Sequence, residues 1–286
     1  MKKQFGLLLL ILFLVVSPAH SKDLVIVVKI SGSINPAVAE YVSHEISQAN
    51  ADQEALIVLH MDTPGGLDTS MRQIIKKIQV SQVPVASFVA PSGSRAASAG
   101  TFITIASHIA AMAPGTNIGA AHPVNMMGGG GEGGQAKTME KKVVNDAAAY
   151  IRSLAELRKR NAHWAELAVV QSVSISAEEA KRLNVIDFIA GDVNALVLAV
   201  DGRIVQVASG SVTLKTGGLP IVYHEMNPRQ KFLDLISNPN IAYILMMLGL
   251  VGLYFELSNP GLVLPGVVGA ISLILALYAM QTLPIN

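Results

Sequence analysis

Two long apolar runs that contain no charged residue, residues 241–255 and 262–280, constrain the fold of this chain most. In a bilayer every backbone polar group must be hydrogen-bonded within the protein, so runs of this kind cross the membrane as helices. The sequence therefore predicts a transmembrane hairpin, with helices at about residues 241–257 and 262–280. A buried hairpin of a soluble domain is the alternative, and the absence of a polar face on either run argues against it.

The first 21 residues have the parts of a secretory signal peptide. Two lysines follow Met1, an apolar core runs from Leu7 to Val16, and small residues lead up to Ser21. We expect cleavage after Ser21, which places the following domain on the extracytoplasmic (periplasmic) side of the membrane. An uncleaved anchor is the alternative, although the apolar core is short for a membrane span.

Between these segments, apolar strand-like runs alternate with helical patterns. This alternation predicts an α/β domain at residues 22–195, with a largely parallel sheet covered on both faces. A long amphipathic helix is predicted at residues 141–160. The predicted strands are residues 23–30, 55–61, 83–90, 108–113 and 185–190.

The pattern changes after residue 195. Short strand-like runs at residues 196–200, 203–208 and 212–215 are separated by glycine-containing turns, which predicts a small β-rich appendage at residues 196–226. An amphipathic lead-in to the membrane hairpin is expected from residue 227. Earlier in the chain, the glycine-rich residues 126–135 predict an irregular loop, either a lid over a site or a plain spacer.

Composition excludes several classes of site. The chain has no cysteine, so it has no disulfide, no thiolate nucleophile and no cysteine-based metal site. Its seven histidines are dispersed without the spacing of metal ligands, so we expect no metal and no cofactor. Lysine and arginine are scattered and the net charge is +1, so we expect no nucleic-acid partner.

Two turns built from small residues follow successive predicted strands. Residues 62–66 read Asp-Thr-Pro-Gly-Gly, and the backbone N–H groups of Gly65 and Gly66 can bind a phosphate or an oxyanion there. Residues 91–101 carry Ser98 at a strand-to-helix turn, the usual setting of a nucleophilic serine. The alternatives are a plain turn and a serine that only caps a helix. Taken together, the two turns favour an oxyanion hole beside Ser98.

Several motifs, in this order along the chain, resemble the membrane-bound serine proteases of the NfeD type, within the ClpP and crotonase-like superfamily. The resemblance covers residues 23–195 and extends into the hydrophobic tail. It implies a crotonase-like spiral of ββα units, Ser98 as nucleophile, and the amides of Gly66 and Ala99 as oxyanion donors. The motifs are residues 62–66, 90–101, 113–123, 176–180, 184–187 and 257–266.

The resemblance implies a Ser–Lys dyad in which Lys142 is the base. A lysine accepts a proton only when its amine is uncharged, which requires a poorly solvated position. Asp146 lies one helical turn further on and could pair with Lys142, which would work against that state. Lys141 and Lys137 are competing candidates, and a solvated charge at the start of a helix is the alternative for all three.

His122 is the rival base. It lies where ClpP-type proteases, which resemble this segment, carry the histidine of a Ser–His–Asp triad. The segment that would supply the acid has Ser172 instead, and a histidine without an orienting acid has no fixed tautomer. We therefore favour Lys142 and keep His122 as an alternative base or a residue that lines the site.

The resemblance implies an endopeptidase that cleaves apolar stretches of membrane proteins by acyl-enzyme chemistry. It also implies a stomatin-like membrane protein as partner, and we expect a homo-oligomer. An inactive membrane scaffold of the same fold is one alternative. A crotonase-like acyl-CoA enzyme is another, and the secretory start argues against it because coenzyme A is cytoplasmic.

Overall fold

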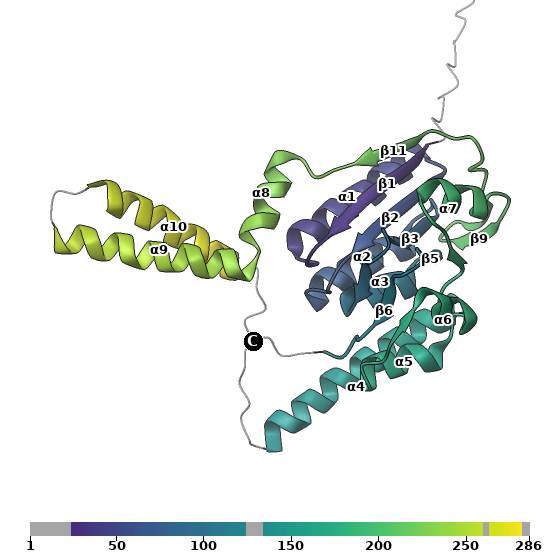
Figure 1. Cartoon of the computed structure of the whole chain (residues 1–286), viewed down its shortest axis with the longest axis horizontal. Coiled ribbons are helices and arrows are strands. Elements are labelled where there is room, and N and C mark those ends of the chain that lie inside the picture. Colours follow the sequence, from purple (N-terminus) through teal and green to yellow (C-terminus); the bar gives the residue numbers. More distant parts are fainter. Residues whose placement is uncertain (1–23, 124–133, 260–262, 282–286) are drawn as a thin grey trace, which may run out of the picture.

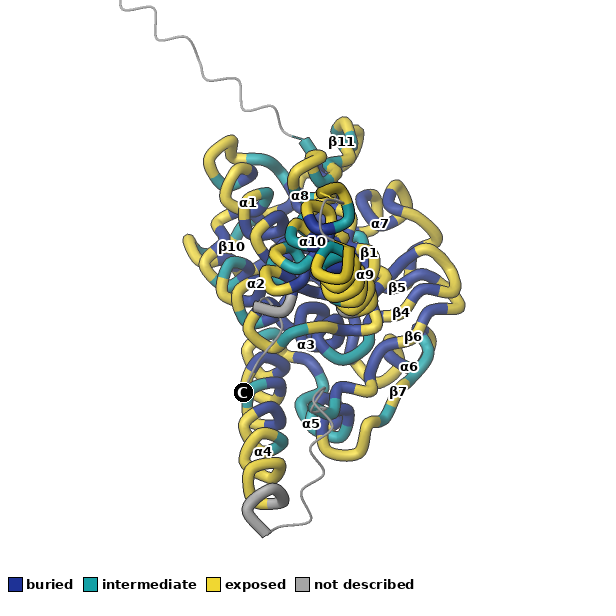
Figure 2. The backbone as a smooth tube through the Cα atoms, turned by 90° about the vertical axis from the view of Figure 1, so that its left-hand side faces the viewer, coloured by how far each residue is buried: buried dark blue, intermediate teal, exposed yellow. Residues whose placement is uncertain are grey.

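The computed structural model describes residues 24–123, 134–259 and 263–281. The predicted signal peptide and nearly all of the glycine-rich segment at residues 126–135 lie outside the described residues. Within them, an α/β domain carries a helical hairpin that projects to one side (Figure 1). Most hairpin residues are exposed, whereas the centre of the α/β domain is buried (Figure 2).

A parallel six-stranded sheet forms the centre of the domain, as the alternating pattern predicts (Figure 1). Val, Ile and Leu dominate its inner strands, which are buried on both faces, as parallel strands usually are. The register pairs Val25 with Leu56 and Ser31 with Asp62, so the first two strands end side by side. In spatial order the strands are β11 (Ile221–His224), β1 (Val25–Ser31), β2 (Leu56–Asp62), β3 (Val85–Val89), β5 (Ile109–Met112) and β8 (Phe188–Ile189).

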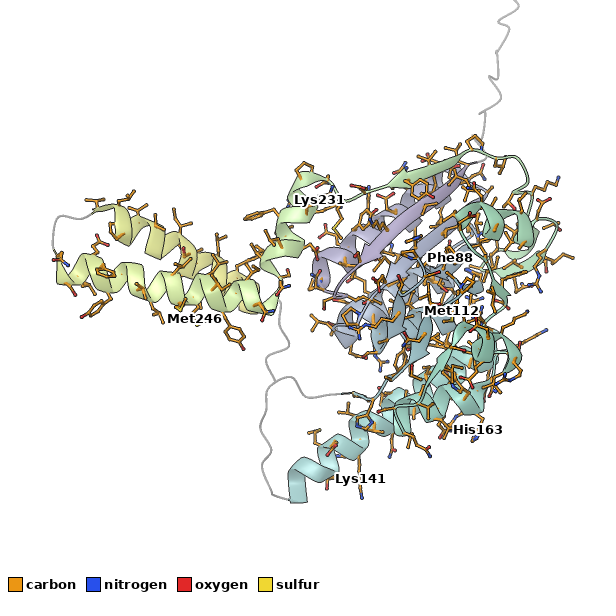
Figure 3. The ribbon with its side chains drawn as sticks, in the orientation of Figure 1. Phe88, Met112, Lys141, His163, Lys231 and Met246 are labelled. Atoms are coloured by element: carbon orange, nitrogen blue, oxygen red, sulfur yellow. The ribbon has the colours of Figure 1, made fainter. Side chains whose placement is uncertain are left out.

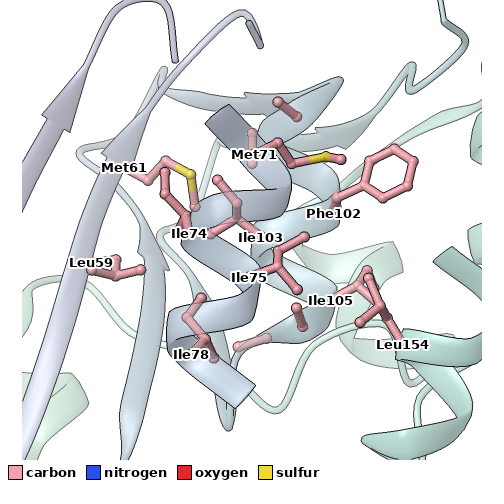
Figure 4. Close-up of a cluster of buried hydrophobic side chains, with 14 of the residues drawn as sticks. Leu59, Met61, Met71, Ile74, Ile75, Ile78, Phe102, Ile103, Ile105 and Leu154 are labelled. Carbon is pink, nitrogen blue, oxygen red and sulfur yellow. The ribbon is translucent and has the colours of Figure 1, made fainter. Parts of the chain in front are cut away.

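Helices cover the sheet and bury two apolar clusters against its faces. The larger cluster includes Leu59 of β2, Ile75 of α2, Phe102 of α3 and Leu154 of α4 (Figure 4). These helices form because their apolar residues recur at helical spacing and face the sheet. The helices of the domain are α1 (Pro36–Asp52), α2 (Asp68–Val80), α3 (Ala99–Ala106), α4 (Gly134–Leu157), α5 (Ala162–Val170), α6 (Ala177–Arg182) and α7 (Val193–Val200).

A second, smaller sheet lies beyond the ends of the central strands. It comprises β4 (Arg95–Ala97), β6 (Asn117–Gly119) and β7 (Ser174–Ser176), with β4 parallel to β6 and β6 antiparallel to β7. The chain therefore runs from a central strand into a short outer strand and then into a helix, as β3, β4 and α3 do. This is the predicted ββα arrangement.

The prediction for residues 196–200 is wrong, because they belong to helix α7. Four buried residues at helical spacing, Val193, Leu196, Val197 and Val200, face the core, and Asp192 caps the helix. The following β9 (Ile204–Val207) and β10 (Gly210–Thr213) do form an antiparallel hairpin. The next strand, β11, joins the central sheet beside β1.

Two other boundaries differ from the prediction. Helix α4 begins at Gly134, inside the segment predicted to be irregular, and ends at Leu157. Of residues 185–190, only the two that form β8 are in a strand.

The lead-in and the hairpin consist of α8 (Pro228–Ile236), α9 (Pro239–Ser258) and α10 (Val263–Gln281). Asn227 and Gln230 form a capping box that starts α8. Among the described helices, residues Asn240–Ser258 are long and apolar enough to cross a membrane, while Val263–Ala279 is apolar but shorter. The second membrane span therefore stays a prediction.

The two hairpin helices pack very closely at glycines. A Cβ at Gly249 would lie 2.9 Å from the Cβ of Leu273, and one at Gly252 would lie 2.6 Å from the carbonyl oxygen of Pro265. The backbones can approach this closely only because the side chains are absent, as is common between membrane helices.

Buried His108, the residue before β5, should make folding stability depend on pH. Its Nδ1 accepts a hydrogen bond from the Val85 N–H (3.1 Å), and burial lowers its pKa from 6.5 to about 3, helped by Arg158 and Arg160. Between those pH values the unfolded chain binds a proton that the folded chain excludes, so stability is lost as pH falls from 6.5 towards 3.

His108→Asn keeps an acceptor for Val85 but cannot titrate. It should remove about 2–3 kcal/mol of the stability difference between pH 7 and pH 4.5, measured by urea unfolding of the detergent-solubilised chain. The unsubstituted chain, unfolded under the same conditions, is the control. An unaltered pH dependence in His108→Asn would contradict the assignment.

Candidate active site

The two small-residue turns meet in the folded chain. The Thr63 N–H donates to the Arg95 carbonyl (2.8 Å), and the Ala97 N–H donates to the Thr63 carbonyl (3.1 Å). Thr63 and Ala96 thus form a parallel bridge between the end of β2 and strand β4. The segment after β2 is therefore held beside the turn that carries Ser98.

Ser98 has the backbone conformation of a presented nucleophile. It lies between β4 and α3 with φ 50° and ψ −116°, a strained conformation for a residue with a side chain. Its N–H donates to the Gly119 carbonyl (3.2 Å), which holds the turn in place. Its side chain makes no capping hydrogen bond to α3, and the residue is only half-buried. The interpretation of Ser98 as a simple helix cap is therefore wrong.

Gly65 lets the first turn approach Ser98. Its φ is +117°, and a Cβ built on it would lie 2.5 Å from the Ser98 Cβ and 3.1 Å from the Ser98 Oγ. Only glycine fits both the conformation and the space. The Gly65 N–H donates to Thr63 Oγ1 (3.0 Å), so this amide already has a partner. Gly65 therefore allows the two turns to pack closely beside Ser98, and its own amide is not available to bind an oxyanion.

Gly66 and Ala99 carry backbone N–H groups that donate no hydrogen bond within the described residues. Ala99 is the first residue of α3, where the N–H groups have no partner inside the helix and the helix dipole favours negative charge. The backbone of Ile34 packs directly against Gly66, since a Cβ on Gly66 would lie 2.2 Å from the Ile34 carbonyl oxygen. The segments next to Ser98 therefore carry two backbone N–H groups without a hydrogen-bond partner among the described residues. An oxyanion hole requires donors of this kind.

Lys142 is exposed on the N-terminal part of α4, the part that projects from the domain and is marked by Lys141 in Figure 3. Lys142, Asp146 and Tyr150 share one face of α4, since they are four residues apart. Asp146 forms its ion pair with Arg72 of α2 and not with Lys142. The Arg72 guanidinium also lies 4.3 Å from the centre of the Tyr150 ring.

The shared face of α4 is turned towards α2 and α3. Tyr150 stacks on Phe102 of α3 with ring centres 6.1 Å apart, and further along the Arg158 Nε donates to the Ala106 carbonyl (2.8 Å). Helices α3 and α4 therefore run in the same direction. Ser98 lies one turn before Phe102 on α3, and Lys142 lies two turns before Tyr150 on α4. Because Phe102 and Tyr150 are in contact, the face of α4 that carries Lys142 is turned towards the end of α3 at which Ser98 lies.

His122 lies three residues after Gly119, whose carbonyl binds the Ser98 N–H. It is half-buried, and its Nδ1 lies 2.9 Å from the Val169 carbonyl oxygen. Because a carbonyl only accepts, Nδ1 carries the proton, and Nε2 has no hydrogen-bond partner among the described residues. A backbone carbonyl thus supplies the orientation for which the sequence offered no acid, and Ser172 is exposed.

No hydrogen bond joins Ser98 to Lys142 or to His122 within the described part of the chain. Lys141 is exposed like Lys142, and the side chain of Lys137 lies outside the described residues. Sequence reasoning missed Arg72, Tyr150 and Ile34, which support the site. Their contacts join segments far apart in the chain, so no local pattern marks them. No group of three or more His, Asp or Glu residues in the described chain is arranged to hold a metal ion.

Two family models match the chain. The NfeD1b N-terminal domain matches residues 24–202, and the NfeD integral membrane domain matches residues 240–286. The first covers the α/β domain from β1 to α7, including the candidate site. The second covers the hairpin, including residues that the structure does not describe.

Two curated proteins are similar over most of the chain. The membrane-bound protease PH1510 of Pyrococcus horikoshii is 36% identical over 271 residues, which are 94% of this chain and 61% of the relative. The membrane protein NfeD1b of Bacillus subtilis is 26% identical over 271 residues, which are 90% of this chain and 56% of the relative. The chain thus spans about three-fifths of the length of these relatives.

Solved structures of a Pyrococcus horikoshii protease domain match the α/β domain. A lysine-to-alanine mutant of the 1510-N membrane-bound stomatin-specific protease, in complex with a substrate peptide, aligns with TM-score 0.68 and 35% identity, covering 75% of this chain and 98% of that one. A serine-to-alanine mutant of the same protease aligns with TM-score 0.66 and 35% identity, covering 72% and 99%.

Proposed function

Because the chain belongs to the NfeD family, as its matches to both NfeD domains show, we propose that it is a membrane-bound serine protease. The observation that carries this proposal is the geometry of Ser98. The residue is held in a strained turn against Gly65, without a capping bond, between segments that carry two uncommitted amides. The similarity to proteases, one of them a serine mutant and one with a bound peptide, supports it.

The proposed reaction begins with transfer of the Ser98 hydroxyl proton to a base as Oγ attacks the carbonyl carbon of a peptide bond. The carbonyl electrons move to oxygen, and the amides of Gly66 and Ala99 stabilise that oxyanion. The base then gives its proton to the leaving nitrogen, the C–N bond breaks, and an ester on Ser98 remains. Water then replaces the departed amine: it gives a proton to the base as its oxygen attacks the ester carbonyl, the bond to Ser98 Oγ breaks, and Oγ takes the proton back as the acid is released.

We assign the base to Lys142. The amine must be uncharged to accept the Ser98 proton, so a bound peptide that excludes water would assist it. Asp146 is engaged by Arg72, which leaves Lys142 without that carboxylate as a partner. The lysine-to-alanine mutation in the peptide-bound relative supports a lysine at the site. His122 is the alternative base, because its Nε2 has no partner among the residues that the structure describes.

We propose that the substrate is an apolar segment of a membrane protein, and that a stomatin-like protein is the partner, as the names of the similar structures indicate for the Pyrococcus protease. The arrangement supports a substrate near the membrane. β11 is parallel to β1 and its carboxyl end leads into α8. The carboxyl ends of the central strands, next to the site, therefore face the hairpin (Figure 1). A homo-oligomer and an extracytoplasmic site belong to the same proposal.

Trapping the acyl-enzyme tests this function. The detergent-solubilised chain, mixed with a peptide ester that has an apolar acyl half, should gain the mass of the acyl group on the tryptic peptide that contains Ser98. The ester accumulates because hydrolysis of a good ester substrate is limited by deacylation. Acylation elsewhere, or none together with no peptide cleavage, would refute the protease and leave a membrane scaffold of the same fold.

A further inference from the structure

Helix α8, which leads into the membrane hairpin, is hydrogen-bonded to the start of α1. The Nδ2 of Asn35 donates to Oδ1 of Asp234 at 2.7 Å, across 199 residues of sequence. Asn35 is buried, with 6% of its surface exposed, and Asp234 is half-buried. Among the described residues, this is the one side-chain hydrogen bond between α8 and the α/β body. Lys231 of α8 also forms an ion pair with Glu225, but that pair is exposed and local.

Asn35 is adjacent to the residue that supports the oxyanion turn. Ile34 is fully buried and forms a parallel bridge with Gly66. The Ile34 N–H donates to the Gly65 carbonyl (2.8 Å), and the Leu67 N–H donates to the Ile34 carbonyl (2.9 Å). The backbone of Ile34 thus fixes the residues on both sides of the Gly66 amide.

The Asn35 side chain is held at two points. Its Oδ1 accepts the Val38 N–H (3.0 Å) and caps α1, while its Nδ2 binds Asp234. A hydrogen bond from an amide to a carboxylate is stronger than one between two neutral groups, particularly when it is half-buried. Displacing Asp234 would therefore free one side of Asn35, one residue from the strand bridge that fixes Gly66.

We propose that Asp234 is a positioning residue for the oxyanion turn, acting through Asn35 and Ile34, and that the membrane lead-in thereby sets the geometry of the catalytic site. This inference rests on the proposed protease function. Catalysis by an oxyanion hole depends on donor positions to a fraction of an ångström, whereas ground-state binding of a peptide depends on them less. The link therefore acts on kcat more than on KM.

Exchanging the two side chains tests the link. Asn35→Asp keeps an acceptor for the cap of α1 but sets a carboxylate against Asp234. In the full detergent-solubilised chain it should lower kcat for peptide hydrolysis about 10-fold and change KM less than about 2-fold. Adding Asp234→Asn restores an amide–carboxylate pair with the roles exchanged, so kcat should return to within about 3-fold of the starting value.

Asn227→Asp is the matched control, since the Asn227 side chain also caps a helix, α8, but its described hydrogen bond lies within its own capping box. It should leave kcat unchanged. Hydrogen exchange gives a readout that needs no activity, because the Leu67 amide should exchange faster in Asn35→Asp and slow again in the double variant.

The outcomes separate the two proposals. A parent chain that neither cleaves peptide nor forms an ester on Ser98 refutes the protease, while the Leu67 amide still tests the link. If the parent cleaves peptide but Asn35→Asp retains its kcat, or the double variant fails to recover, the link to Asp234 is refuted and the protease stands. An equal fall of kcat and of the thermal midpoint in Asn35→Asp and Asn227→Asp would reduce the effect to loss of a helix cap and also refute it.

Discussion

Alanine in place of Ser98 should abolish peptide hydrolysis by the detergent-solubilised chain, lowering kcat/KM by about 10⁴-fold or more. Without the hydroxyl no acyl-enzyme can form, and only the weak catalysis of the oxyanion donors over water remains. The substitution keeps Cβ and so keeps the backbone strain at φ 50°, which means that the fold should be unaffected. Cleavage of a labelled apolar peptide, followed by chromatography, measures the change.

The control for this prediction is Ser92→Ala. Ser92 lies in the same small-residue segment but is exposed, and its loss should leave hydrolysis unchanged. Equal losses in both variants, or hydrolysis above about 1% of the starting rate in Ser98→Ala, would remove Ser98 from the role of nucleophile.

Lys142→Ala should lower kcat/KM by about 10²–10³-fold, because the Ser98 proton then has no base to accept it. Lys142→Arg should be as inactive, since a guanidinium stays charged. His122→Ala should cost less than about 10-fold if His122 only lines the site. Peptide hydrolysis by each purified variant, at equal folded concentration, compares them.

Lys141→Ala is the matched control, because Lys141 is the adjacent exposed lysine of α4. It should be close to fully active. The reverse result, a large loss in His122→Ala and a small one in Lys142→Ala, would assign the base to His122, whose Nδ1 is bonded to the Val169 carbonyl.

The parts of the fold that sequence predicts well have local causes. The inner strands β1, β2 and β3 consist mostly of buried apolar residues, and the turn at Ser98 is a run of small residues between a strand and a helix. β11 was not predicted as a strand. None of its four residues is fully buried, and they form a strand because they pair with β1, almost 200 residues earlier.

The candidate site shows the same division. Glycines 65 and 66 could be assigned to a turn from sequence because turn conformation depends on the residues in the turn. The partner of Asp146 could not be, because the helical spacing points to Lys142 while the folded chain brings Arg72 of α2 against it. Helix α7 was predicted to be a strand because eight aliphatic-rich residues have no clear period in so short a window.

The glycine contacts between α9 and α10 make the hairpin stiff. Two helices with touching backbones bend less than one, and α9 alone is about 30 Å long at the usual rise per residue. A stiff hairpin of that length transmits a change of its tilt to α8, the helix that contains Asp234. Bilayers of different thickness tilt such rods by different angles. If the proposed protease function and the proposed Asp234 link both hold, peptide hydrolysis should depend on the thickness of the surrounding lipid.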